Sequence, residues 1–462
     1  MLVLEQHYLK CLSQASYLIG DADAGVAAVV DPRRDVEVYL EAAERLGVEI
    51  KHVLLTHFHA DFLAGHLELA AATGATLHLG AAAEAEFDFL PFADGEQLEL
   101  GAVSITALAT PGHTPESTCY VVRSSAEAEP HAVLTGDTLF IGDVGRPDLM
   151  SSVGVTAAEL AGALYDSLHG KLLKLPDETI LYPGHGAGSS CGKSLSTALS
   201  CTIGAQRASN YALQEMSRDA FVAAVTAGQK PAPAYFGHDA KLNKSVRPLL
   251  DEALSRALTP LSIDAALAAQ SEGAVLLDTR DADSFARGFL PGAVFIGLDG
   301  RFASWAGTVL APDKELVLIC EAGKEREAAT RLGRIGYDQV LGFLEDPLSV
   351  MEKLSSLQTI QRVSPSELAS LLAEDEELAV IDVRGEGEFE SGRIKGAGNL
   401  PLQRPDELVL EAPVEGRHVL HCQGGYRSLI AASLIAQRTG APLMDLVGGF
   451  EAWEEAGLDV QR

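Results

Sequence analysis

The most restrictive feature of this sequence is an internal repeat in its second half. Two segments share the same landmarks in the same order: an apolar strand ending in Asp-x-Arg, a phenylalanine in an acidic helix start, a Gly-Ala pair, and a cysteine after a second apolar strand. The landmarks are Asp278, Phe285, Gly292 and Cys320 in the first copy, and Asp382, Phe389, Gly396 and Cys422 in the second. An offset that stays at 102 to 104 residues indicates a duplicated domain. Strands that alternate with helices predict a parallel sheet covered on both faces.

The first half of the chain lacks this repeat and has its own strand pattern. We expect a helix that ends at Leu46. The expected strands lie at residues 17–19, 27–31, 53–55, 76–79, 103–108, 119–122, 132–134 and 180–182. A chain of 462 residues is long enough for about three domains. The expected domains span residues 1–250, 258–355 and 360–462.

Composition excludes several classes of protein. With 35 Lys and Arg against 65 Asp and Glu, the net charge of -30 repels phosphate backbones, so we expect no nucleic-acid partner. No uncharged apolar stretch reaches the roughly 18 residues of a membrane span, and no basic-then-apolar leader is present, so neither a membrane segment nor a secretory signal is expected. Six irregularly spaced cysteines are too few for a disulfide scaffold and favour a reducing, cytoplasmic location.

Four loops of the first half carry side chains of the metal-ligand type, and each loop follows an apolar strand. One loop contains His-x-His-x-Asp, and the other three are rich in glycine or proline. The candidate ligands are His57, His59, Asp61, His113, Asp137 and His185. A single His-x-His pair is a weak indication, because isolated histidines are usually surface or core residues. Four such loops after four strands are hard to obtain by chance, so the sequence predicts a metal centre.

This pattern resembles the metallo-β-lactamase superfamily over roughly residues 1–245. The resemblance implies an αββα sandwich with the metal at one edge of its two sheets. The binuclear hydrolases of the superfamily, such as glyoxalase II, have a histidine directly after the aspartate of His-x-His-x-Asp. Here Asp61 is followed by Phe62, so a ligand for a second metal is missing.

A longer match, through residues 136–140, 142–148 and 185–189, is to the persulfide dioxygenases, which use a single non-haem iron. Carried over residue by residue, this resemblance places one Fe(II) per chain on His57, His113 and Asp137. It leaves His59, Asp61 and His185 around those ligands. Two imidazoles and one carboxylate leave three open positions, as in Fe(II) oxygenases, where a persulfide sulfur and O2 can bind together. Spacing alone does not distinguish iron from zinc.

Several residues near the third and fourth loops are candidates for contacting substrate. Arg146, Lys193 and Arg207 are cations that either hold an anionic thiol substrate or form salt bridges. Cys191 and Cys201 flank the loop that the family uses on its substrate side. Cys201 is either a sulfur relay or a buried structural thiol.

The second copy of the repeat carries a candidate catalytic cysteine. Cys422 follows an apolar strand and precedes a helix, so backbone N–H groups and the positive helix end stabilise its thiolate. Gly424 and Gly425 allow the loop to curl around the sulfur. The spacing from Cys422 to Arg427 resembles the active loop of rhodanese, in which the cysteine carries a sulfane sulfur and the loop amides and arginine support it.

The first copy has Cys320 at the equivalent place but a different loop. Cys320 and Arg326 have the Cys-x5-Arg spacing of phosphatases, yet Ile319 replaces the usual preceding histidine. Glu321 and Glu325 put negative charge where an anion would bind, and like charge raises a thiol pKa. We therefore expect a degenerate rhodanese-like domain with a structural role.

Together, the motifs resemble fused persulfide dioxygenase–rhodanese proteins: an αββα metallo-β-lactamase sandwich followed by two rhodanese-like parallel α/β domains. The resemblance implies oxidation by O2 of a thiol persulfide of the glutathione or coenzyme A type to sulfite and thiol. Sulfur transfer at Cys422, with thiosulfate formed or used, would complete a sulfide detoxification reaction. The alternatives are a glyoxalase II-like thioester hydrolase with an appended sulfurtransferase and a non-enzymatic sulfane-sulfur carrier. By resemblance alone, we expect a homodimer or homotetramer.

Overall fold

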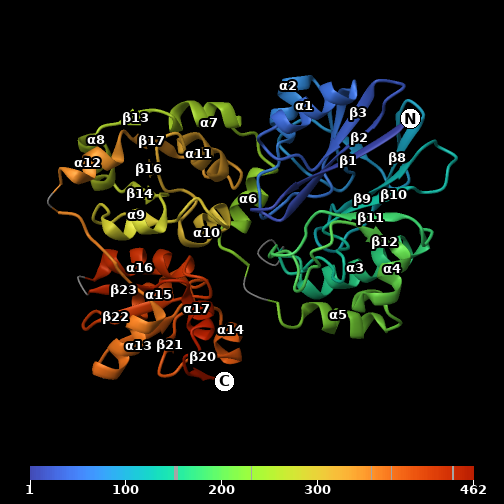
Figure 1. The fold of residues 1–462 in the computed structure, drawn as a ribbon. Helices are drawn as coiled ribbons and strands as arrows, with labels where there is room; N and C mark the ends of the chain where they lie inside the picture. Colours follow the sequence, from blue (N-terminus) through green and yellow to red (C-terminus); the bar gives the residue numbers. More distant parts are fainter. Residues whose placement is uncertain (150–153, 230–231, 355, 376, 440–441) are drawn as a thin grey trace. The chain divides into compact units, whose positions relative to one another are not determined.

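The structure is a computed structural model that describes residues 1–149, 154–229, 232–354, 356–375, 377–439 and 442–462 (Figure 1). The chain divides into a first unit, residues 1–250 with 333–336, and a second unit, residues 251–332 with 337–462. Ser355, the expected end of the second domain, lies outside the described residues. None of the helices in the described ranges is both long and apolar enough to cross a bilayer.

The first unit contains two six-stranded sheets. The first sheet is built in chain order from β1 (Leu2–Leu9), β2 (Gln14–Asp21), β3 (Val26–Val30), β4 (Glu49–Leu54), β5 (Thr76–Gly80) and β6 (Leu90–Phe92). The second sheet contains β7 (Gln97–Leu100), β8 (Val103–Ala109), β9 (Thr118–Arg123), β10 (Ala132–Gly136), β11 (Ile180–Pro183) and β12 (Cys201–Thr202). All eight expected strands are present, whereas β1, β6, β7 and β12 were not predicted.

Helices cover the outer faces of both sheets. They are α1 (Glu37–Leu46), α2 (His66–Thr73), α3 (Ala157–Gly170), α4 (Ile203–Ser209) and α5 (Arg218–Thr226). A further helix, α6 (Phe236–Leu242), follows them in the chain. The α1 helix ends where predicted, because Gly47 takes the left-handed conformation that stops a helix (φ 67°). The α3 helix begins at a capping box in which Thr156 and Glu159 bond each other's backbone amides.

Three apolar clusters set the order of layers in this unit. Side chains such as Ile19, Leu54 and Ile105 fill the space between the two sheets. Tyr39 of α1 packs on the outer face of the first sheet, and Leu164 of α3 packs on the outer face of the second. Figure 1 shows the same order, with α1 and α2 over one sheet and α3 beside the other. The predicted αββα sandwich is therefore confirmed.

The second unit contains two five-stranded sheets, and all the strand pairs within each are parallel. The middle domain contains β13 (Pro260–Leu261), β14 (Val275–Asp278), β15 (Val294–Phe295), β16 (Leu316–Ile319) and β17 (Val340–Leu344). The C-terminal domain contains β18 (Gln361–Val363), β19 (Ala379–Asp382), β21 (Gly398–Asn399), β22 (His418–His421) and β23 (Leu443–Leu446). A separate two-stranded antiparallel sheet is formed by β20 (Arg393–Ile394) and β24 (Val460–Gln461). These are the two parallel α/β domains that the repeat predicts.

Helices alternate with these strands. In the middle domain they are α8 (Ile263–Ser271), α9 (Ala282–Arg287), α10 (Phe302–Val309), α11 (Glu325–Gly333) and α12 (Pro347–Glu352), preceded by α7 (Leu250–Ala257). In the C-terminal domain they are α13 (Pro365–Glu374), α14 (Glu386–Ser391), α15 (Pro405–Glu411), α16 (Arg427–Arg438) and α17 (Gly449–Glu455). The α13 helix begins at a capping box formed by Ser364 and Glu367.

The Asp-x-Arg motif of the repeat forms the same buried network in both domains. Arg280 donates to both carboxylate oxygens of Asp278 (Nε to Oδ1 2.9 Å, Nη2 to Oδ2 2.6 Å). Arg384 donates in the same way to Asp382 (3.0 and 2.7 Å). In each copy the guanidinium also donates to the carbonyl of the glycine eight residues further along. The motif therefore ties the end of a central strand to the helix that follows it.

Replacing Asp278 with alanine would leave the Arg280 guanidinium buried without its carboxylate. Breaking a buried ion pair costs about 3–5 kcal/mol, so we expect the free energy of unfolding of the second unit to fall by about this amount. Urea denaturation of the full chain followed by tryptophan fluorescence measures it, because both tryptophans, Trp305 and Trp453, lie in this unit. The control Asp313→Ala removes an exposed carboxylate. Equal, small effects of both substitutions would contradict a structural role for the motif.

Candidate functional site

Three predicted metal ligands meet in the first unit. His57 lies in the loop after β4, His113 in the loop after β8 and Asp137 directly after β10. All three are buried, and one ligand atom from each lies within 4.8 Å of the others. The Oδ2 atom of Asp137 is 3.6 Å from Nε2 of His113 and 3.9 Å from Nε2 of His57. Two imidazole nitrogens and one carboxylate oxygen thus converge on one point.

The remaining polar atoms of two ligands are held by the protein. Nδ1 of His113 lies 2.8 Å from the carbonyl oxygen of Arg146, so Nδ1 carries the proton and Nε2 presents a lone pair. Oδ1 of Asp137 accepts from Nδ1 of His185 at 2.7 Å. Nε2 of His113 and Oδ2 of Asp137 are buried and have no hydrogen-bond partner among the described residues. A divalent cation would satisfy both atoms.

The third ligand is oriented by Asp31, a residue that the sequence analysis did not identify. Asp31 adopts an unusual positive φ of 51°, a strained conformation that is typical of functional sites. Its carboxylate accepts from the backbone N–H (2.8 Å) and the hydroxyl (2.7 Å) of Thr56. Because the Thr56 hydroxyl donates its hydrogen to Asp31, its oxygen accepts from Nδ1 of His57 at 2.9 Å. This leaves the lone pair on Nε2 of His57 for a metal. The same carboxylate lies 3.1 Å from Nε2 of His59.

The donor set fits a divalent transition metal with open positions. Two neutral imidazoles and one carboxylate form the facial arrangement of non-haem Fe(II) oxygenases, and each ligand has the outer partner that such sites require. Burial lowers the pKa of His57 well below its ordinary value, with His59 contributing in the same direction, so the ring is neutral and able to bind metal. The residues therefore fit iron, and the donor types also accept zinc.

His185 lies between two carboxylates. Its Nδ1 is 2.7 Å from Oδ1 of Asp137, and its Nε2 is 2.8 Å from Oδ2 of Asp61. Burial alone would lower the pKa of His185, but these carboxylates outweigh it and raise the pKa well above its ordinary value. Cys191, which burial keeps as a thiol by raising its pKa well above the usual range, lies within 4.8 Å of the Asp61 and His185 ligand atoms. The structure thus brings Cys191 to the site, which the sequence analysis placed only in a nearby loop.

The proposed substrate contacts already have protein partners. Arg146 is buried and donates to both oxygens of Asp148 at 2.7 Å. The Lys193 ammonium donates to a backbone carbonyl at 2.8 Å, and Arg207 donates to another at 2.9 Å. Cys201 is half-buried in β12. Of the two alternatives, the structure gives a salt bridge both for Arg146 and for Arg207, which lies 3.4 Å from Asp177. Contact of these four residues with substrate stays a prediction.

Gly136 and Asn243 allow the ligand loops to approach each other. Gly136 precedes Asp137 with a positive φ of 48°, and a Cβ atom there would lie 2.4 Å from the Thr56 hydroxyl. Asn243 donates to the carbonyls of His59 and Phe62 and accepts from a third amide of the same loop, all at 2.8 Å. Gly136 lies in the 136–140 match, where the sequence analysis assigned it no role of its own, and Asn243 lies in no motif.

Gly136→Ala should disturb the metal centre without removing a ligand. The added methyl group pushes Thr56 away from Asp31 and His57, so we expect iron bound per chain after anaerobic reconstitution to fall by about tenfold or more. Elemental analysis of the purified protein measures it. The matched control is Gly142→Ala, because Gly142 also has a positive φ (86°) but nothing lies within 4 Å of its Cβ position. Equal iron in both variants would show that the close approach is unimportant.

In the C-terminal domain, residues 422–427 form a loop between β22 and α16, which we call the C-terminal cysteine loop. The Cys422 sulfur accepts from the backbone N–H of Gly425 at 3.1 Å. Ser428 donates to the same sulfur at 3.7 Å. Arg427 donates to both oxygens of Glu388 at 2.7 and 2.8 Å, and these bonds lower the pKa of Glu388. The sequence analysis predicted this loop but not its partner Glu388 on α14.

In the middle domain, residues 320–326 form the first cysteine loop, and its charges are arranged differently. Gly323, the counterpart of Gly425, donates its N–H to the carboxylate of Glu325 at 3.1 Å. Glu325 stands at the place of Arg427. The Cys320 sulfur accepts from the Thr279 hydroxyl at 3.2 Å. Burial and the nearby carboxylates raise the pKa of Cys320 to about 12.

Alkylation rates should separate the two cysteines, although each is only 1% exposed. With a pKa of about 12, only roughly one Cys320 in 10,000 is thiolate at pH 8, and this fraction rises about tenfold per pH unit. We expect iodoacetamide to modify Cys320 at least about tenfold more slowly than Cys422. Peptide mass spectrometry after timed quenching gives both rates from one sample. Equal rates would contradict the assignment of the middle domain as degenerate.

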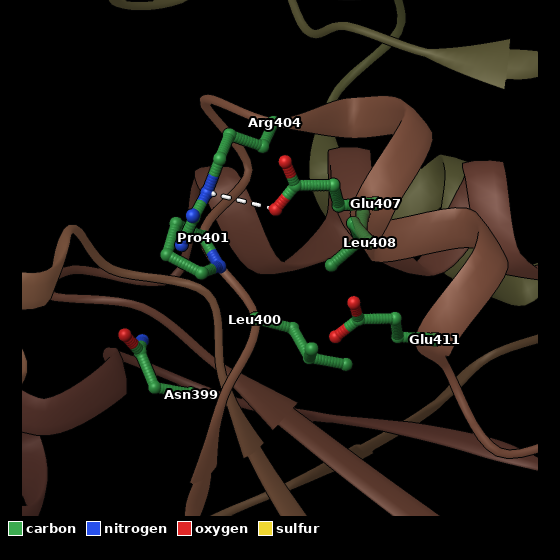
Figure 2. Close-up of a pocket in the computed structure, with 7 residues that line it drawn as sticks. All are labelled: Asn399, Leu400, Pro401, Arg404, Glu407, Leu408 and Glu411. Atoms are coloured by element: carbon green, nitrogen blue, oxygen red, sulfur yellow. Dashed lines mark ion pairs between the residues drawn. The ribbon is translucent and has the colours of Figure 1, made fainter.

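A surface pocket of the C-terminal domain lies apart from the cysteine loop (Figure 2). Its lining comes from α15 and the segment before it: Asn399, Leu400, Pro401, Arg404, Glu407, Leu408 and Glu411. Arg404 pairs with Glu407 at 3.2 Å across it. The lining contains no cysteine or histidine, so this pocket carries none of the chemistry predicted for the chain.

The chain matches two protein-family models and is similar to several known proteins. Residues 9–185 match the model of the metallo-beta-lactamase superfamily, and residues 262–346 and 364–456 each match the model of the rhodanese-like domain. The hydroxyacylglutathione hydrolase of Rhodospirillum rubrum is 34% identical over 253 residues, which cover 54% of this chain and 88% of that protein. The human mitochondrial persulfide dioxygenase ETHE1 is 29% identical over 190 residues, which cover 40% of this chain and 68% of that protein.

One solved structure extends this similarity beyond the first unit. The crystal structure of a metallo-beta-lactamase from Staphylococcus aureus subsp. aureus COL aligns with 74% of this chain and 98% of its own. The TM-score is 0.67 and the sequence identity is 31%. The similarity therefore includes more of the chain than its N-terminal sandwich.

Proposed function

Because the chain belongs to the metallo-β-lactamase superfamily and continues into two rhodanese-like domains, we propose that it is a persulfide dioxygenase joined to a sulfurtransferase. The first unit would bind one Fe(II) and oxidise a low-molecular-weight thiol persulfide. One persulfide, one O2 and one water would give one thiol and one sulfite. The observation that carries this proposal is the convergence of His57, His113 and Asp137 within 4.8 Å, with Phe62 where a second-metal ligand is expected.

The surrounding residues support a single metal with open positions. Iron bound by the three ligands would supply sites for the persulfide sulfur and O2 side by side. His185 fixes the Asp137 carboxylate through one oxygen, so only the other faces the metal position. The Phe62 ring lies against the His59 ring at a centroid distance of 4.3 Å, tilted by 41°, and adds an apolar surface at the place of the missing ligand. These contacts support the proposal of a single cation.

Sulfur transfer would take place at the C-terminal cysteine loop. A sulfane sulfur carried on Cys422 as a persulfide would be attacked by sulfite, giving thiosulfate and returning Cys422 as a thiolate. The Gly425 N–H that now bonds the sulfur would then stabilise that thiolate. The dioxygenase product is thus a suitable acceptor for the second reaction, and together they would lower persulfide levels in sulfide detoxification.

Separate sites predict separable activities. Iron-loaded protein should consume O2 with glutathione persulfide or coenzyme A persulfide, but not with the parent thiols, in an oxygen-electrode assay. Asp137→Ala should reduce the rate by at least about a hundredfold, because a metal ligand is lost. Cys422→Ser should abolish transfer of sulfur from thiosulfate to cyanide while O2 uptake stays within about twofold.

The outcomes of this assay also decide between the proposals. No O2 uptake with any of the persulfides would refute the dioxygenase and leave the thioester hydrolase and the non-enzymatic sulfur carrier. Loss of both activities in Cys422→Ser would contradict two separate sites.

A thioester hydrolase is the second candidate, favoured by the 34% identity to a hydroxyacylglutathione hydrolase. The chain keeps Asp61 and His185 but has Phe62 where the binuclear hydrolases have a histidine. Hydrolysis of S-lactoylglutathione by the zinc-loaded protein, without persulfide-dependent O2 uptake by the iron-loaded protein, would support this candidate instead.

A further inference from the structure

The C-terminal cysteine loop is bonded to the middle domain through Tyr426. The Tyr426 hydroxyl donates to the carbonyl oxygen of Gly297 at 2.7 Å, and burial raises the pKa of this phenol, so it stays protonated. Gly300 lies against the ring: a Cβ atom there would be 3.8 Å from it. The segment 297–300 is itself fixed by Arg331, which donates to the carbonyls of Leu298 and, at 2.9 Å, of Gly300.

The helix that follows the loop rests on the same domain. α16 packs against β15, and the fully buried Ser433 hydroxyl accepts from the backbone N–H of Phe295 at 3.0 Å. Further along α16, Gln437 donates to the carbonyl of Gly292 at 3.1 Å. Both domains belong to one compact unit. The loop and its helix are therefore fixed at several points by a domain whose own cysteine is disabled.

The loop needs such external support because of its composition. Gly424 and Gly425 have no side chains with which to fix the backbone, and glycine is the residue with the greatest conformational freedom. Gly425 holds a positive φ of 87° and directs its N–H at the Cys422 sulfur. Gln423, which precedes the two glycines, accepts from Arg384 of its own domain at 3.1 Å. After the glycines, Tyr426 is the first residue with a side chain that can be anchored. Its counterpart in the first cysteine loop, Lys324, pairs instead with Glu327 on its own helix at 2.9 Å.

We propose that Tyr426 is a positioning residue, and that the middle domain is a working part of the sulfurtransfer site. The bond from Tyr426 to Gly297 holds the Gly425 amide on the Cys422 sulfur. On this proposal the middle domain has no active cysteine of its own, but it provides the rigid contact for the C-terminal cysteine loop. This inference rests on the proposed sulfurtransferase function of Cys422.

The test compares two tyrosine variants in the full chain. Tyr426→Phe removes the hydroxyl that reaches Gly297. The matched control Tyr337→Phe removes a hydroxyl-to-carbonyl bond of the same kind, from Tyr337 to Leu310 at 2.8 Å, within the middle domain. Sulfurtransfer from thiosulfate to cyanide and alkylation of Cys422 by iodoacetamide at fixed pH are measured for both variants.

We expect Tyr426→Phe to lower kcat for sulfurtransfer by about five- to tenfold, with the KM for thiosulfate within about twofold, because Arg427 is unchanged. Cys422 should at the same time be alkylated at least about threefold faster, because its sulfur is buried in the wild-type protein and becomes accessible when the loop opens. Tyr337→Phe should change neither rate. The proposal would be wrong if kcat and the alkylation rate of Cys422 were unchanged in Tyr426→Phe, or if Tyr337→Phe changed both to the same extent. If the wild-type protein transfers no sulfur, the proposed sulfurtransferase fails, while the alkylation rates still decide whether Tyr426 holds the loop.

Discussion

A carboxylate buried at the end of a strand must find positive or donor groups close by, and each functional part of this chain is organised around one. Asp31 and Asp137 directly follow β3 and β10, and both are at most 1% exposed. Their partners are the groups that orient the metal ligands. Asp278 and Asp382 end β14 and β19, and their partners are arginines that close the following helix onto the sheet. The same requirement thus shapes a site in one unit and a scaffold in the other.

The two cysteine loops differ mainly in which anion receives a glycine amide. In the C-terminal loop, the N–H of Gly425 points at sulfur, and Arg427 supplies a cation held by Glu388. In the first loop, the equivalent N–H is taken by the carboxylate of Glu325. The reversal of charge from Arg427 to Glu325 thus goes with a different partner for the glycine amide, while the surrounding sheet and helices keep their arrangement.

Patterns that repeat or that follow buried strands were sufficient to predict most of the fold. The eight predicted strands of the first unit are buried apolar runs, whereas β7 and β12 are short and partly exposed and have no such pattern. Residues within motifs, such as His113 and Asp137, could be grouped from sequence because each follows a strand. Asp31, Asn243 and Glu388 could not, because they act through partners 25 to 184 residues away that only tertiary folding brings close.

The carboxylate of Glu325 has a thermodynamic consequence for the middle domain. A loop whose amide is already occupied by its own side chain gains nothing from a bound anion, so the folding of that domain is uncoupled from the supply of sulfur species. In the C-terminal loop no carboxylate takes the Gly425 amide, which bonds the Cys422 sulfur. Under the proposed function, a sulfur ligand that binds only the folded form would add binding free energy to the stability of that domain. Under the proposed function, the middle domain would stay folded whatever the supply of sulfur species, and would support a neighbour whose stability depends on the sulfur ligand that it carries.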